Sequence, residues 1–210
     1  GQTELVEVLT GLRRPEKGRV ALAGTEIGGL TPRRVREQGV GHIPEDRHRR
    51  GLVLEYTVAD NTILGIHYRP PFVNSLGVDI LNPAAINAKA ERLVAEFDIR
   101  PTDHQNPAGN LSGGNQQKVV VAREMDQAPK LLIAAQPTRG VDVGSIEFIH
   151  KRLIQARDAG TAVLVISADL EEVLNLADRI AVIYEGEIVG ELAPEEANEE
   201  RLGLLMTGAG

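Results

Sequence analysis

One short run of the chain, residues 111–117 (LSGGNQQ), has the residue types of a phosphate-binding loop. Two adjacent glycines let a backbone approach a ligand closely. A helix that begins after them presents unpaired N–H groups and the positive end of its dipole. The Ser112 hydroxyl adds a hydrogen-bonding group. Taken alone, the run is more typical of a glycine-rich turn in which Ser112 caps a helix.

Two other polar segments follow apolar runs that have the composition of buried strands. Residues 131–135 lead into QPTRGVD at 136–142, and residues 162–166 lead into Ser167-Ala168-Asp169. Nucleotides bind at the carboxyl ends of strands in parallel sheets. We therefore expect both segments to lie at a ligand-binding edge, which strengthens the phosphate interpretation of residues 111–117.

The elements that must position these loops are predicted from hydrophobic periodicity and turn residues. Helices are expected over 1–12, 58–66, 83–97, 116–125, 143–158 and 170–177, and strands over 19–23, 40–43, 131–135 and 163–167. Residues 68–82 are expected to be a loop, and Glu185-Gly186 to be the turn of a hairpin formed by 179–184 and 187–190. The alternation of strands and helices predicts an α/β fold with a parallel sheet and crossover helices.

Composition excludes several classes of function. The 210 residues carry a formal net charge of −7, which argues against nucleic acid as a partner. The absence of cysteine excludes disulfides and thiolate chemistry, and the histidines lack metal-ligand spacing, so no metal site is predicted. The apolar runs are too short to cross a bilayer.

Together these residues resemble the ATP-binding cassette family, the ATPase domains of ABC transporters, over essentially the whole chain. Residues 111–117 with Lys118 match its signature motif, and we call this run the signature loop. The remaining similarities are to the Walker A tail (1–3), the Q-loop (42–45), the Walker B strand (131–137), the D-loop with its aspartate at Asp142 (137–142) and the switch-histidine loop (167–169). The resemblance implies a P-loop NTPase-like, RecA-like core with an inserted α-helical subdomain.

The departures from the family pattern are concentrated in one site. Thr3 keeps the P-loop hydroxyl, but the lysine that neutralises the β- and γ-phosphates is replaced by Gln2. Ala135 stands in place of the Mg²⁺-binding aspartate, and Gln136 in place of the catalytic glutamate. An amide positions water but is a negligible base. The switch histidine and the Q-loop glutamine are replaced by Ala168 and Glu45.

In this family two cassettes face head to tail, and each nucleotide lies between the Walker motifs of one and the signature loop of the other. The resemblance therefore implies that Ser112, Gly113, Gly114, Asn115 and Gln116, with Asp142, contact ATP and Mg²⁺ held mainly by a partner cassette. We expect the chain to be part of an ATP-hydrolysing transport ATPase, yet catalytically inactive alone.

Three longer segments look like the second, C-terminal cassette of tandem ATPases that serve simple-sugar and nucleoside importers. They are IPEDRHRRGLV (43–53), LIAAQPTRGVDVG (132–144) and RIAVIYEGEIVG (179–190). The implied partners are another cassette, transmembrane permease subunits and, indirectly, a substrate-binding protein, at the cytoplasmic face of the cell membrane. The cargo stays open between sugars and nucleosides, with IAAQP favouring nucleosides. The basic run 47–50 is either a solvated turn or, by resemblance, a surface near the membrane subunit.

The expected division is a nucleotide-binding core formed by 1–44 and 115–210 and a helical subdomain at 45–114. Because the first helix starts without a preceding strand or glycine loop, we expect an upstream segment that completes the P-loop. Two alternatives remain. One is an ABC-type ATPase that is not a transporter, although such proteins usually keep both carboxylates or carry coiled-coil or basic insertions. The other is a structural or regulatory docking module in which the signature loop is a relic.

Overall fold

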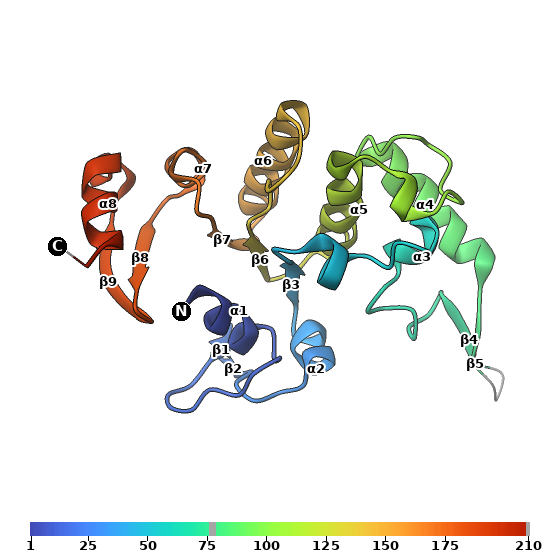
Figure 1. The fold of residues 1–210 in the computed structure, drawn as a ribbon. Coiled ribbons are helices and arrows are strands. Elements are labelled where there is room, and N and C mark those ends of the chain that lie inside the picture. Colours follow the sequence, from blue (N-terminus) through green and yellow to red (C-terminus); the bar gives the residue numbers. More distant parts are fainter. Residues whose placement is uncertain (76–78, 209–210) are drawn as a thin grey trace.

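The computed structural model describes residues 1–75 and 79–208 and is built on a parallel sheet. Strands β3 (Val40–Ile43), β6 (Leu131–Ala135) and β7 (Ala162–Ile166) are hydrogen-bonded in the order β3-β6-β7 (Figure 1). All three start level, because Val40 pairs with Leu131 and Leu131 pairs with Ala162. The predicted α/β fold with a parallel sheet is confirmed, and the carboxyl ends of the strands meet at one edge.

The central strand β6 has its buried side chains on both faces, as expected for a parallel sheet covered by helices. Leu132 and Ala134 pack in the cluster that includes α5 (Gly113–Met125) and α6 (Val143–Asp158). Ile133 and Ala135 pack on the other face, against residues of α1 (Gln2–Leu9) and α2 (Pro32–Glu37). Alternate side chains of one strand thus join the two helical layers.

The remaining elements surround this core. The other helices are α3 (Val58–Thr62), α4 (Pro83–Glu96), α7 (Leu170–Leu176) and α8 (Glu199–Met206), with a short π-helix at Arg47–Gly51 and 3₁₀ turns at Ala108–Asn110 and Pro194–Glu196. Three antiparallel pairs stand apart from the parallel sheet: β1 (Ala21–Leu22) with β2 (Thr25–Glu26), β4 (Val73–Ser75) with β5 (Asp79–Leu81), and β8 (Ile180–Tyr184) with β9 (Glu187–Leu192). None of the helices in the described ranges has the length and apolar composition needed to span a membrane.

Several expected boundaries were wrong. The first helix ends at Leu9 rather than residue 12, because Gly11 adopts a positive φ of 78° that ends the helix. The helix expected over 58–66 stops at Thr62, and the strand expected over 19–23 is reduced to Ala21–Leu22. The loop expected over 68–82 contains β4 and β5, with residues 76–78 outside the described ranges. The hairpin turn is confirmed, with φ of 48° at Glu185 and 91° at Gly186.

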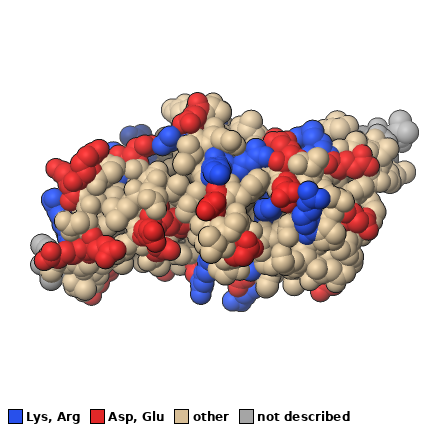
Figure 2. All heavy atoms as spheres, turned by 90° about the horizontal axis from the view of Figure 1, so that it is seen from above, with Lys and Arg blue, Asp and Glu red and all other residues tan. Residues whose placement is uncertain are grey.

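Acidic side chains gather at the end of the molecule that carries β8, β9 and α8, on the left of Figure 2. The exposed carboxylates of this end are Glu185, Glu187, Glu191, Glu195, Glu196, Glu199 and Glu200. A surface of this charge repels the phosphates of a nucleic acid. The carboxylates at residues 195–200 are exposed and therefore solvated.

One buried carboxylate joins both layers to the sheet. Glu124 of α5 has no exposed surface and accepts hydrogen bonds from Arg36 of α2 at 2.8 Å, from Arg123 at 2.8 Å and from the His42 backbone N–H at 3.2 Å. Arg123 also donates to the Gly51 carbonyl at 2.7 Å. Burial acts to raise the pKa of Glu124, but the charges of Arg123 and Arg36 outweigh it, and the pKa lies below its ordinary value. Glu124 is therefore ionised.

Removing that charge should destabilise the fold. We expect Glu124→Gln to lower the free energy of unfolding by about 3 kcal/mol, because two guanidinium groups lose their counter-charge in a buried site. Urea unfolding followed by circular dichroism measures this change. The matched control is Glu91→Gln on the exposed face of α4, which should change the value by less than about 0.5 kcal/mol. Equal effects of the two substitutions would contradict the role given to Glu124.

Candidate functional site

A groove of about 280 Å³ lies at the carboxyl ends of β3, β6 and β7. It brings together five of the residues singled out from the sequence: Gln2, Thr3, Glu45, Ala135 and Gln136. The sixth, Ala168, is exposed in the segment between β7 and α7 and is not among the residues that line this groove. The loops expected at a single sheet edge therefore do meet there, apart from the switch-loop position.

The charged groups of the groove are three arginines and two carboxylates. Arg49, Arg50 and Arg139 line it together with Glu45 and Asp46. Arg139 Nη1 pairs with Glu45 Oε1, so this carboxylate is already engaged. The part of the chain that the structure describes has no group of three or more His, Cys, Asp or Glu side chains arranged to hold a metal ion. With Ala135 at the end of β6, the residues of this groove do not fit Mg²⁺.

Gln136 has a strained backbone. Its φ of 49° lies in the left-handed region, which costs a non-glycine residue about 1 kcal/mol. A hydrogen bond from its N–H to the Ile166 carbonyl, 2.7 Å long, holds it against the end of β7. Strain of this kind is concentrated at functional sites. The end of β6 therefore carries an amide side chain on a left-handed backbone held by β7.

His42 adds no positive charge to the groove at neutral pH. Burial lowers the pKa of its imidazole to about 4, and only part of that effect is offset by attraction to Glu124. Its Nε2 is buried and has no hydrogen-bond partner among the described residues. The ring is therefore neutral and forms part of the groove wall beside Pro44.

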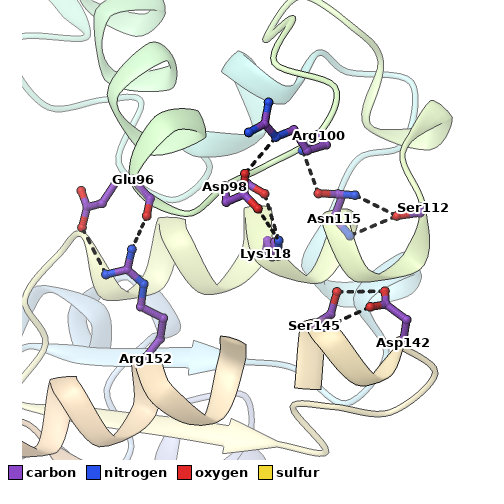
Figure 3. A network of polar contacts seen from close by, with 9 residues as sticks. All are labelled: Glu96, Asp98, Arg100, Ser112, Asn115, Lys118, Asp142, Ser145 and Arg152. Carbon is purple, nitrogen blue, oxygen red and sulfur yellow. Dashed lines mark hydrogen bonds and ion pairs between the residues drawn. The ribbon is translucent and has the colours of Figure 1, made fainter. Parts of the chain in front are cut away.

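The signature loop forms the N-terminus of α5 (Figure 3). Ser112 Oγ accepts from the Asn115 backbone N–H at 3.4 Å and from Asn115 Nδ2 at 2.9 Å. Asn115 Oδ1 in turn accepts from the Arg100 N–H at 2.7 Å. Ser112 is thus a helix cap, as the turn interpretation expects. In the described part of the chain the N–H groups of Gly113 and Gly114 have no acceptor; Gly113 is half-buried and Gly114 is buried.

The N-terminus of α6 lies directly against that of α5. Asp142 caps α6 by accepting from the Ser145 N–H at 3.0 Å and from Ser145 Oγ at 2.9 Å, and these bonds lower the pKa of Asp142 (Figure 3). A methyl group on Gly114 would lie 2.2 Å from Ser145 Oγ and 2.4 Å from Asp142 Oδ2. Gly114 is therefore required by packing, and Asp142 connects the D-loop to the signature loop within this chain.

The glutamines of the signature loop point into the molecule. Gln116 is buried, its Oε1 is 2.8 Å from His48 Nε2, and its Nε2 donates to the Ala108 carbonyl. Gln117 Nε2 donates to the Pro137 carbonyl at 2.7 Å. The structure thus places the Gln116 side chain on neighbouring loops rather than on the exposed surface with Ser112, and a contact of Gln116 with a ligand stays a prediction.

Charged contacts hold the C-terminal end of α4 and the residues after it to α5 and α6 (Figure 3). Lys118 Nζ donates to the Asp98 carbonyl at 2.9 Å, and Arg100 Nε donates to Asp98 Oδ1 at 2.8 Å. Arg152 of α6 reaches the Glu96 carboxylate at 3.8 Å. Exposed ion pairs stabilise a fold by less than about 1 kcal/mol each. Their role here is to fix the orientation of the loop at residues 98–100, which holds Asn115.

Some site residues were missed from the sequence. Arg139 lines the groove, and Arg47 contacts the D-loop. The sequence predicts neither contact, because the basic run 47–50 is expected to be a solvated turn or a surface near the membrane subunit. The solvated interpretation was wrong for Arg47, since its guanidinium donates to backbone carbonyls. Ser145 could have been found from its spacing, because it is the third residue after the capping Asp142.

Comparison with known proteins places the chain in a family. The profile of the family described as "ABC transporter" matches residues 1–139. The guanosine import ATP-binding protein NupO of Bacillus subtilis strain 168 is 52% identical over 209 residues, covering 100% of this chain and 40% of that protein. The nucleoside import ATP-binding protein NupA of Lactococcus lactis subsp. cremoris strain MG1363 is 54% identical over 208 residues, covering 99% and 40%. The chain thus spans less than half the length of these relatives.

Solved structures show the same fold. The dimeric structure of a post-hydrolysis state of the ATP-binding cassette MJ0796 bound to ADP and Pi has a TM-score of 0.76 at 20% identity, covering 92% of this chain and 81% of that chain. The nucleotide-free ATP-binding cassette from an ABC transporter has a TM-score of 0.76 at 23% identity, covering 99% and 80%. The predicted fold class, an ABC cassette of the P-loop NTPase type, is confirmed.

The contact between the two helix starts can be tested by adding one methyl group. Gly114→Ala should lower the free energy of unfolding by about 2 kcal/mol, because the side chains of Ser145 and Asp142, which cap α6, must shift to admit the methyl group. The matched control is Gly203→Ala in α8, where the added methyl meets no atom within 4 Å and should raise stability by about 0.5 kcal/mol. Thermal and urea unfolding of the two variants measure both values. If Gly114→Ala is as stable as the unmodified protein, the close contact is not present in solution.

Proposed function

Because the chain belongs to the ABC transporter family of ATP-binding proteins, we propose that it completes an ATP site shared with a partner cassette. In this proposal the chain donates its signature loop to a nucleotide held by the partner, and it hydrolyses no ATP in its own groove. It is the degenerate, second cassette of a tandem import ATPase.

One asymmetry carries this proposal. The signature loop keeps two glycine N–H groups without acceptors at the start of a long helix, where the dipole favours an anion. The groove at the end of β6 keeps its shape, including the left-handed backbone of Gln136, but has no lysine at Gln2 and no carboxylate at Ala135 or Gln136. The chain thus has the signature loop that contacts a partner's nucleotide but lacks the lysine and carboxylates that would hold and hydrolyse a nucleotide of its own.

The residues of the signature loop fit a terminal phosphate of ATP. The N–H groups of Gly113 and Gly114 would donate to phosphate oxygens, and the Ser112 hydroxyl, exposed at the surface, would add a third donor. ATP bound there supplies the phosphoryl group whose hydrolysis drives transport. Asp142 and Ser145 keep the loop in place, and a contact of Asp142 with the partner's nucleotide stays part of the proposal. Mg²⁺ is assigned to the partner's side of the site, since this chain's groove does not fit it.

We further propose how the chain is divided into subdomains and where it lies in the cell. Residues 1–44 and 115–210 form the nucleotide-binding core, and residues 45–114 form a helical subdomain that transmits closure of the cassette pair to permease subunits. The chain is then peripheral at the cytoplasmic face of the membrane and is served indirectly by a substrate-binding protein. Relatives named as guanosine, nucleoside and glucose import proteins support nucleosides or simple sugars as the cargo.

The shared site is tested by adding a negative charge to the signature loop. In the assembled importer, Gly113→Asp should lower ATP turnover about 100-fold, because a carboxylate then repels the phosphate where N–H groups should hold it. Gly203→Asp, in α8 where there is space for a side chain, is the matched control and should retain turnover. Restoring Asp at 135 and Glu at 136 should add little activity, because the lysine is still missing. Wild-type turnover in Gly113→Asp would contradict the proposal.

A further inference from the structure

Arg47 occupies a position between three loops that the proposed function treats separately. It begins the π-helix that follows Glu45, and Asp46 fixes this turn by accepting from the N–H groups of His48 and Arg49 at 3.0 and 3.1 Å. The side chain therefore leaves the turn in a defined direction, toward the loop that joins β6 to α6.

The guanidinium of Arg47 spans two consecutive carbonyls of that loop. Nη1 donates to the Arg139 carbonyl at 2.9 Å, and Nη2 donates to the Gly140 carbonyl at 3.2 Å. These partners are 92 and 93 positions away in the sequence. A planar guanidinium is suited to such a two-pronged contact, whereas a lysine ammonium offers only a single centre.

The same guanidinium lies against the signature loop. A methyl group on Gly113 would be 2.8 Å from Arg47 Nη2 and 3.1 Å from the Gly140 carbonyl oxygen. Arg47 Nε is buried and has no hydrogen-bond partner among the described residues, whereas the side chain as a whole is half-buried. The adjacent His48 contacts Gln116 of α5, so the turn that carries Arg47 also packs on α5.

We propose that Arg47 is a positioning residue that holds the signature loop against the D-loop. The two loops then face the partner's nucleotide as one rigid unit. The inference rests on the proposed shared site and adds the residue that orients the signature loop within it. Without Arg47, Gly114 is still held by Asp142 and Ser145, but Gly113 loses the neighbour that fixes it against the Gly140 carbonyl. Misplacement of about 1 Å at a catalytic group lowers rates by one to two orders of magnitude.

The test compares ATP turnover and local backbone protection in the assembled importer. Arg47→Met removes both Nη donors and keeps an unbranched aliphatic side chain. It should lower kcat about tenfold, with the KM for ATP changed less than about twofold, because the partner holds most of the nucleotide. Hydrogen exchange should become faster in peptides covering 112–117 and 138–143 but not in β6 or β7. Arg47→Lys should remain impaired, since one ammonium does not replace the fork.

Arg34→Met is the matched control, because Arg34 is an exposed arginine of α2 that pairs with Glu37 on the surface. It should leave kcat and exchange unchanged. The inference is overturned if Arg47→Met has wild-type kcat, if exchange rises uniformly along the chain, or if Arg47→Lys restores full activity. If Gly113→Asp abolishes turnover while Arg47→Met does not affect it, only the positioning role of Arg47 is wrong. If neither variant affects turnover, the shared site itself is wrong.

Discussion

The arrangement of the candidate site depends on one close contact, the meeting of the first turns of α5 and α6 at Gly114. The capping pair Asp142 and Ser145 fills the space that a side chain at Gly114 would need. Since α6 follows the loop after β6, this contact connects the signature loop to the carboxyl end of the sheet. Arg47 closes the junction from the other side by bonding the Arg139 and Gly140 carbonyls.

This contact holds the signature loop in place without any side chain of the neighbouring groove, which agrees with the proposal that the groove itself does not hydrolyse ATP. The loop's geometry comes from caps, glycines and backbone bonds, none of which involves Gln2, Ala135 or Ala168. The groove's shape comes from parallel strands that end at one edge and from the bond between Gln136 and Ile166. In the proposed shared site, Gln2, Ala135 and Gln136 would therefore lack the catalytic side chains while the scaffold around them stays in place.

The parts of this structure that could be predicted from the sequence are those set by local pattern. The strand at residues 131–135 follows from its apolar run, and the Glu185-Gly186 turn follows from its residue types. The meeting of loops at the sheet edge follows from parallel topology. The π-helix at Arg47–Gly51 could not be predicted, because the carbonyls that Arg47 contacts lie 92 and 93 positions away and the Gln116 that His48 contacts lies 68 positions away. Nor could the role of Gly114, since its glycine requirement comes from Ser145 on another helix.

The central claim is that the phosphate held by this chain belongs to a partner's nucleotide. The most direct measurement is a cryo-electron microscopy structure of the assembled importer with a non-hydrolysable ATP analogue. The account predicts a terminal phosphate about 3 Å from the Gly113 and Gly114 nitrogens, with the rest of the nucleotide bound by the partner cassette. A nucleotide whose phosphates lie in this chain's own groove, against Thr3 and Gln136, with no phosphate at the signature loop, would contradict it.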